Sequence, residues 1–74
     1  YPIYAYIDDA TGLRKNARVK MIGVNVGQVL SKHLEGDKVK LKLMINNDVK
    51  IPANSLLSLS QDSMLGEKYV KIIP

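Results

Sequence analysis

The strongest constraint on the fold is a strict alternation of apolar and other side chains over residues 38–45, which read KVKLKLMI. Successive side chains of a β-strand point to opposite faces, so this period of two predicts a strand with one buried and one solvated face. The apolar members are expected in the core: Val39, Leu41, Leu43 and Ile45. The lysines of the other face are expected to be exposed: Lys38, Lys40 and Lys42.

Similar short segments follow one another along the chain, with turn-forming residues between them. They cover residues 3–7, 17–22, 24–32, 49–51, 55–60 and 68–73. No window carries an apolar stripe with the 3.6-residue period of a helix. The sequence therefore predicts an all-β fold, either a small barrel or a sandwich, and a barrel is favoured because it leaves no exposed sheet edges.

Gly27 lies inside the predicted strand 24–32, where a glycine weakens regular pairing. The apolar side of this strand changes after the glycine, from Val24 and Val26 to Val29. This change predicts a β-bulge or a sharp bend at Gly27, which a closing sheet needs at its corners.

The core of this fold has to be small and aliphatic. The chain has 74 residues, enough for one domain, and 46% of them are hydrophobic, but it contains no Phe, Trp or Cys. A chain of this length buries only about 60% of the surface that its unfolded form exposes. With no disulfide or thiolate metal site, self-association is the means of stabilisation that remains.

Eleven Lys and Arg against seven Asp and Glu give the chain a net charge of +4. Such a balance suits an anionic partner, either nucleic acid or a membrane surface. The basic residues are nevertheless scattered along the sequence, with Arg14-Lys15 the only adjacent pair. An ordinary solvated surface is therefore the favoured interpretation.

Residue types that enzymes and metal sites use are sparse. His33 is the only histidine, no G-x-S-x-G motif surrounds a serine, and no Gly-rich phosphate-binding loop is present. Asp8-Asp9 is followed by Ala-Thr-Gly, a pattern more typical of a turn than of a catalytic carboxylate pair. The sequence predicts no enzyme activity, no metal site and no cofactor.

The apolar runs are only a few residues long, far short of the roughly 20 that cross a bilayer as a helix. The chain begins with Tyr1-Pro2 rather than with methionine, as a domain excised from a longer protein would. We expect residues 1–74 to be a single domain, and any anchor or targeting segment of the parent protein to lie outside them.

Two large apolar residues, Met64 and Leu65, stand in the otherwise polar segment QDSMLGEKY at residues 61–69. This segment is predicted to be a loop, and loops are normally open to water. The pair either folds back into the core or is displayed to a partner, and the residues alone leave both alternatives open. Gly66 is predicted to shape the loop, since glycine adopts backbone conformations that β-branched residues avoid.

Several motifs, taken in order, resemble the MCE ("mammalian cell entry") domain family and its MlaD-like members. They are DDATGL at 8–13, RVKMIGVNVGQV at 18–29, the alternating strand 38–45, IPANS at 51–55 and MLGEKYVKI at 64–72. Together they cover nearly the whole chain, and their combination is far more specific than any one of them.

The resemblance implies a seven-stranded β-barrel that assembles as a homohexamer around a central pore. In MlaD-like members an apolar pair in the loop before the last strand lines the pore, and here those positions are Met64 and Leu65. Many relatives carry two leucines, so Met64 is a departure, although an apolar and more flexible one.

The implied function is non-catalytic transport of phospholipid, or of another hydrophobic molecule, across the bacterial cell envelope, in support of outer membrane lipid asymmetry. The implied location is the periplasm, with an anchor in the inner membrane. The implied partners are the permease and ATPase subunits of an ABC transporter.

Two other functions stay open. A small basic β-barrel could bind nucleic acid, since Tyr4 and Tyr6 share a strand face on which bases could stack, although the sequence shows no basic cluster or aromatic-basic platform. A ring could also act only as a scaffold of the envelope.

Overall fold

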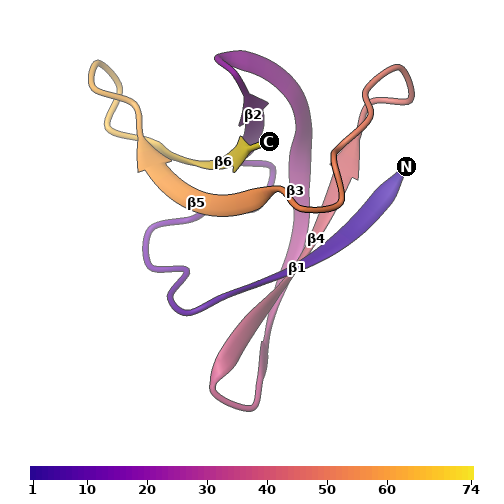
Figure 1. The fold of residues 1–74 in the computed structure, drawn as a ribbon. Coiled ribbons are helices and arrows are strands. Elements are labelled where there is room, and N and C mark those ends of the chain that lie inside the picture. The colour runs from indigo at the N-terminus through magenta and orange to yellow at the C-terminus, as the bar shows by residue number, and fades with distance from the viewer.

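In a computed structural model that describes all of residues 1–74, the chain forms six β-strands in a single sheet (Figure 1). The strands are β1 (Pro2–Ile7), β2 (Arg18–Met21), β3 (Val24–Glu35), β4 (Lys38–Ile45), β5 (Leu56–Gln61) and β6 (Lys68–Ile73). Their order across the sheet is β1-β4-β3-β2-β6-β5. The all-β prediction is confirmed, and the structure contains no helix with the length and hydrophobicity to cross a membrane.

β4 contains the alternating segment, and it pairs antiparallel with β1 on one side and with β3 on the other. Three of the four side chains predicted to be buried are at most 1% exposed: Leu41, Leu43 and Ile45. Val39 is only half-buried, because it lies near the turn between β3 and β4, where the sheet extends away from the core.

The lysine face of β4 is less exposed than its period predicts. Lys38 is exposed, but Lys40 and Lys42 are half-buried. The ammonium group of Lys40 lies 4.8 Å from the ring centre of Tyr4 on β1 and 3.9 Å from a carboxylate oxygen of Glu35. Long lysine side chains cover neighbouring residues with their methylene groups, so a polar strand face is not necessarily a bare one.

Gly27 marks an irregularity of β3, as predicted. Val19 pairs with Gly27, while the next residue of β2, Lys20, pairs with Asn25, so Val26 is the extra residue of a bulge. A Cβ atom at position 27 would lie 2.1 Å from the carbonyl oxygen of Met44. Glycine is therefore required at this position by the close approach of the β4 backbone.

The seven-strand prediction is wrong by one strand, because residues 49–51 form no strand. A local turn lies on each side of this segment. In the first, Val49 N donates to Asn46 O at 3.1 Å, and in the second, Ser55 N donates to Pro52 O at 3.1 Å. The Val49 carbonyl accepts from the Tyr1 hydroxyl at 2.6 Å instead of from a neighbouring strand. The apolar side chains of Val49 and Ile51 still pack against the core, which explains their strand-like pattern.

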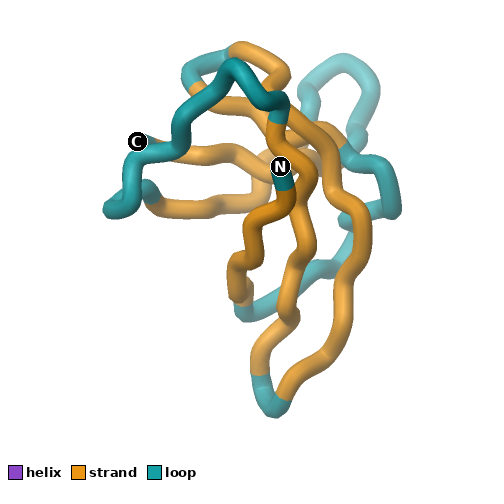
Figure 2. The backbone as a smooth tube through the Cα atoms, turned by 90° about the vertical axis from the view of Figure 1, so that its right-hand side faces the viewer, coloured by secondary structure: helices purple, strands orange, loops and turns teal.

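The sheet curls around one aliphatic core and forms a half-barrel rather than a closed one. The core consists of Leu13, Val19, Val26, Val29, Leu41, Leu43, Ile45, Val70 and Ile72. The edge strands β1 and β5 are not neighbours in the hydrogen-bonded order. The β3–β4 hairpin projects from one end of the sheet in both views (Figures 1 and 2).

One strand pairing positions the region of functional interest. β2 and β6 are parallel, with Val19 opposite Val70, whereas every other pair in the sheet is antiparallel. The starts of these two strands therefore lie at the same end of the sheet. The segment that leads into β2 consequently adjoins the loop that leads into β6.

Candidate functional site

The connection between β5 and β6, residues 62–67, displays the two apolar side chains singled out in the sequence. The antiparallel ladder of β5 and β6 ends at the pair Gln61 and Lys68. Met64 is 91% exposed and Leu65 is 69% exposed, so neither is part of the core of this chain. The loop, in orange-yellow at the upper left of Figure 1, lies at the opposite end of the molecule from the β3–β4 turn.

Asp62 organises this loop through its side chain and its backbone. One carboxylate oxygen, Oδ1, accepts hydrogen bonds from Met64 N at 2.8 Å and Leu65 N at 2.9 Å. The Asp62 carbonyl accepts from Gly66 N at 2.8 Å, and its own N–H donates to the Glu67 carbonyl at 2.8 Å. Polar contacts of the backbone thus hold the loop in shape, while the two apolar side chains stay largely exposed.

Gly66 occupies the left-handed region of backbone conformation, with φ of +72°. Its carbonyl accepts a hydrogen bond from the side-chain amide of Gln61 at 2.9 Å, which ties the end of the loop to β5. Space is not the restriction here, since a Cβ atom at position 66 would lie 3.6 Å from its nearest neighbour, the amide nitrogen of the Gln61 side chain. Glycine is favoured at position 66 because of its positive φ and not because of a close neighbour.

The hydrogen bonds of the loop also affect the acidity of Asp62. The backbone N–H groups of Leu65 and then Met64 lower the pKa of this carboxyl below its ordinary value, because they stabilise the charged form. The positive charges of Lys20 and Arg18 lower the pKa further. The carboxylate is therefore ionised at neutral pH and lies within reach of two cations on β2.

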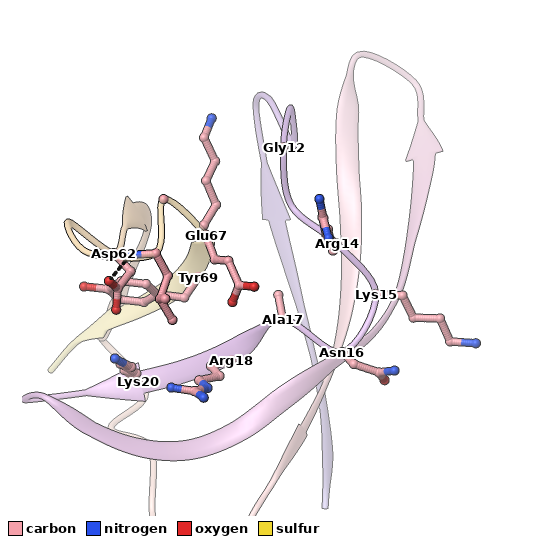
Figure 3. Close-up of a pocket in the computed structure, with 13 residues that line it drawn as sticks. Gly12, Arg14, Lys15, Asn16, Ala17, Arg18, Lys20, Asp62, Glu67 and Tyr69 are labelled. Carbon is pink, nitrogen blue, oxygen red and sulfur yellow. Dashed lines mark hydrogen bonds between the residues drawn. The ribbon is translucent and has the colours of Figure 1, made fainter.

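A groove of about 540 Å³ lies at the base of the loop, between it and the segment that leads into β2 (Figure 3). Its lining, most of which is polar or charged, consists of 13 residues: Gly12, Arg14, Lys15, Asn16, Ala17, Arg18, Lys20, Asp62, Leu65, Gly66, Glu67, Lys68 and Tyr69. Five of these side chains are cationic and two are anionic. Leu65 contributes to this groove, so the apolar loop and the basic groove are continuous.

Several basic residues that are scattered along the sequence come together in this part of the structure. The parallel pairing of β2 and β6 brings residues 14–20 next to residues 68–69, although they are far apart in the sequence. The ammonium group of Lys20 lies 4.7 Å from the ring centre of Tyr69. The fold thereby creates both a basic cluster and an aromatic-basic contact that the sequence pattern did not reveal.

Two functional candidates were missed in the sequence, namely Asp62 and the pair Arg18 and Lys20. Asp62 had a usable signal, because an aspartate often accepts hydrogen bonds from backbone N–H groups two residues further on. Arg18 and Lys20 had none, since only the tertiary pairing places them beside the loop. No group of three His, Cys, Asp or Glu side chains is arranged to hold a metal ion.

Comparisons with known proteins agree with the motifs. The family model described as "MlaD protein" matches residues 1–74, the whole chain. A relative from Haemophilus influenzae, described as "Intermembrane phospholipid transport system binding protein MlaD", is 33% identical over 75 residues, which cover 97% of this chain and 45% of the relative. An uncharacterized protein, ycf22, from Antithamnion sp. is 27% identical over 75 residues, which cover 100% of this chain and 38% of that protein.

A solved structure has the same fold. A chain of the Acinetobacter MlaFEDB complex in an ATP-bound conformation matches with a TM-score of 0.89 at 18% identity, over 100% of this chain and 65% of that one. The chain thus spans less than half the length of the two relatives matched by sequence. Since the family model matches every residue, the chain belongs to the MlaD protein family of MCE domains.

Proposed function

We propose that this chain is a ring-forming subunit of a phospholipid transport system, in which Met64 and Leu65 of several copies line an apolar path through a central pore. The observation that carries the proposal is the display of these two side chains on a loop that polar contacts hold in shape. Each large apolar side chain left in water forgoes about 1.5–3 kcal/mol relative to burial, so a lone domain gains nothing from the pair. A ring recovers part of this free energy, because the copies shield one another's side chains.

The same argument applies to the transported molecule. Exposing a lipid acyl chain to water costs about 0.8 kcal/mol for each CH₂ group. A path across an aqueous compartment therefore has to be apolar without interruption. A collar of Met64 and Leu65 side chains provides such a surface, and the flexible thioether of Met64 adapts it to chains of different shape.

The relatives support the same system. The Haemophilus influenzae relative is described as the binding protein of an intermembrane phospholipid transport system, and the Acinetobacter complex is described in an ATP-bound conformation. By analogy, we propose that the parent protein is a homohexamer in the periplasm, held by an inner-membrane anchor outside residues 1–74. Its partners would be the permease and ATPase subunits of an ABC transporter, and the domain itself would catalyse no reaction.

The double variant Met64→Asn/Leu65→Asn tests the proposal in the full-length parent protein. Because both side chains are exposed, we expect thermal unfolding of the variant domain within about 3 °C of the original, the shift that less than 1 kcal/mol produces in a domain of this size. In cells, the variant should fail to restore phospholipid transport, measured as envelope permeability to a detergent. A folded but inactive variant supports the conduit.

A matched control uses apolar residues that are just as exposed but lie outside the loop. Leu34 is 80% exposed and Leu56 is 66% exposed, so Leu34→Asn/Leu56→Asn makes the same chemical change elsewhere on the surface. This control should fold and remain active. If the loop variant is also fully active, the chain is a scaffold rather than a conduit, and if it unfolds, Met64 and Leu65 have a structural role.

A further inference from the structure

The groove at the base of the Met64–Leu65 loop carries an excess of positive charge. Its two carboxylates, Asp62 and Glu67, form no ion pair with any of its five cations. The ion pairs of the chain, Lys38–Asp8 and Lys40–Glu35, lie outside the groove. The groove is therefore not neutralised by the chain itself.

Arg18 and Lys20 are the cations best placed to act together. Val19, between them on β2, is fully buried, so its two neighbours project from the opposite face of the strand. Both line the groove, and both are close enough to Asp62 for their charges to lower its pKa. Figure 3 shows Lys20 on the side of β2 where Asp62 and Tyr69 lie, with Arg18 beside it along the strand.

The surroundings leave these two cations available to a ligand. Asp62 directs one carboxylate oxygen to the N–H groups of Met64 and Leu65, so its charge is partly used within the loop. Lys20 is held over the ring of Tyr69 at 4.7 Å, which limits the freedom that it would lose on binding an anion. Lys68 differs from this pair, since its ammonium group donates to the Thr11 carbonyl at 2.8 Å.

We infer that this groove binds the phosphate of an anionic lipid, with Arg18 and Lys20 donating to phosphate oxygens and Leu65 contacting the start of the acyl chain. The inference rests on the proposed lipid function and adds a headgroup site to it. A guanidinium group matches phosphate geometry with paired N–H donors, and a lysine ammonium adds a point charge. The site is amphipathic because Leu65 lines the same groove as both cations.

The test is a titration of the isotope-labelled 74-residue chain, followed by amide chemical shifts in NMR spectra. The probe is dihexanoyl phosphatidic acid below the concentration at which it forms micelles. We expect saturable shifts at residues 14–20 and 62–69. The variant Arg18→Gln/Lys20→Gln should weaken binding about a hundredfold, since it removes two charge-assisted hydrogen bonds and each contributes a factor of about ten to the affinity.

Two further variants separate site-specific binding from charge and folding effects. Lys42→Gln/Lys50→Gln removes the same net charge and should change affinity less than about twofold, because neither side chain lines the groove and salt screens charges that lie outside it. Arg18→Lys/Lys20→Arg keeps both charges and should bind within a few-fold of the original. Equal weakening by the groove and control variants would overturn the inference in favour of unspecific charge attraction.

Two alternative ligands are tested in parallel. Inorganic phosphate should bind more weakly than the lipid, and Met64→Asn/Leu65→Asn should weaken the lipid but not inorganic phosphate. Equal affinity for both, with no effect of the loop variant, would identify a free phosphate site and overturn the lipid assignment. Tighter, Arg18-dependent and salt-sensitive binding of a thymidine oligonucleotide would overturn it in favour of nucleic acid.

Failure of this inference is distinguishable from failure of the proposed function. If Arg18→Gln/Lys20→Gln leaves lipid binding unchanged while the Met64–Leu65 variant stops transport in cells, the conduit stands and the headgroup site is wrong. If the loop variant transports normally, the conduit is wrong whatever the groove binds.

Discussion

β4 and the loop 62–67 both carry large apolar side chains, but they use them in opposite ways. Leu41 and Leu43 on β4 are fully buried, whereas Met64 and Leu65 in the loop are 91% and 69% exposed. β4 is held in place by packing between two neighbouring strands. The loop is held by hydrogen bonds to Asp62, so its apolar side chains are not needed to stabilise the fold of the chain.

The comparison teaches that hydrophobicity alone does not tell a core residue from a displayed one. The two regions differ in the groups that form hydrogen bonds with their backbones. In β4, ladder hydrogen bonds bring apolar side chains against a common core, while in the loop a polar side chain satisfies the backbone and turns the apolar ones outward. Substitutions can therefore break one region and leave the other intact.

The largest effect is expected for Leu41→Asp on β4. The variant places an unpaired carboxylate in a fully buried position, at a cost of at least about 4 kcal/mol. A domain of this length has only roughly 4–11 kcal/mol of stability in total, so we expect it to unfold. Loss of the circular dichroism signal of β-structure measures this, and Lys42→Gln on the opposite face of the strand should retain it.

The next effect is expected for Gly27→Ala, which tests the close approach of β3 and β4. The added methyl group would meet the Met44 carbonyl oxygen at 2.1 Å, so the strands have to shift, at about 2 kcal/mol or more. Gly36→Ala is the control, because position 36 has open space and only a positive φ of 63°, worth about 1 kcal/mol. Urea unfolding should rank the two variants in this order, and the reverse order would contradict the role of the contact.

A smaller and local effect is expected for Gly66→Val in the loop. A β-branched residue at φ of +72° is strained by about 1–2 kcal/mol, which the exposed loop can relieve by rearranging. We expect changed amide shifts at Met64 and Leu65, with the signals of β4 unaffected. Gly66→Asn should be nearly silent, since asparagine tolerates this conformation, and equal spectra for both variants would show that the loop imposes no such geometry.

The smallest effect is expected from acid. Because the pKa of Asp62 is lowered in the folded loop, its ionised form stabilises the loop at every pH above the ordinary value of about 3.9. This stabilisation is lost as the pH falls through the lowered value, because the carboxylate takes up a proton and becomes a weaker, neutral acceptor for the N–H groups of Leu65 and Met64. Their amide shifts should titrate with a midpoint below about 3.9 and stay flat in Asp62→Asn; a midpoint above that value would contradict the assigned hydrogen bonds.

The parts of the fold that the sequence predicts are those where local pattern and tertiary packing agree. The alternation of β4 predicts its buried face because the strand is covered on one side only, and Gly27 predicts its bulge because a close backbone approach admits no other residue. Residues 49–51 have the sequence pattern of a strand but do not form one. Val49 and Ile51 pack on the core, but the turns on both sides keep this segment from pairing with a neighbouring strand.

The candidate site is predicted less completely. Met64 and Leu65 are conspicuous in a polar segment, but their exposure depends on Asp62, a contact that the apolar pattern does not include. The basic groove is absent from any sequence window, because Arg18 and Tyr69 meet only through the parallel pairing of β2 and β6. Sites built from distant segments are not visible until the strand order is known.

That parallel pairing also has a consequence for the way the chain is made. β2 obtains its second neighbour only from residues 68–73, so a nascent chain that still lacks them on the ribosome exposes an unpaired edge of β2. Unpaired edges are templates for joining other chains, and contacts between segments distant in sequence form slowly. The interval before β6 emerges is therefore the period in which newly synthesised copies are most prone to aggregate.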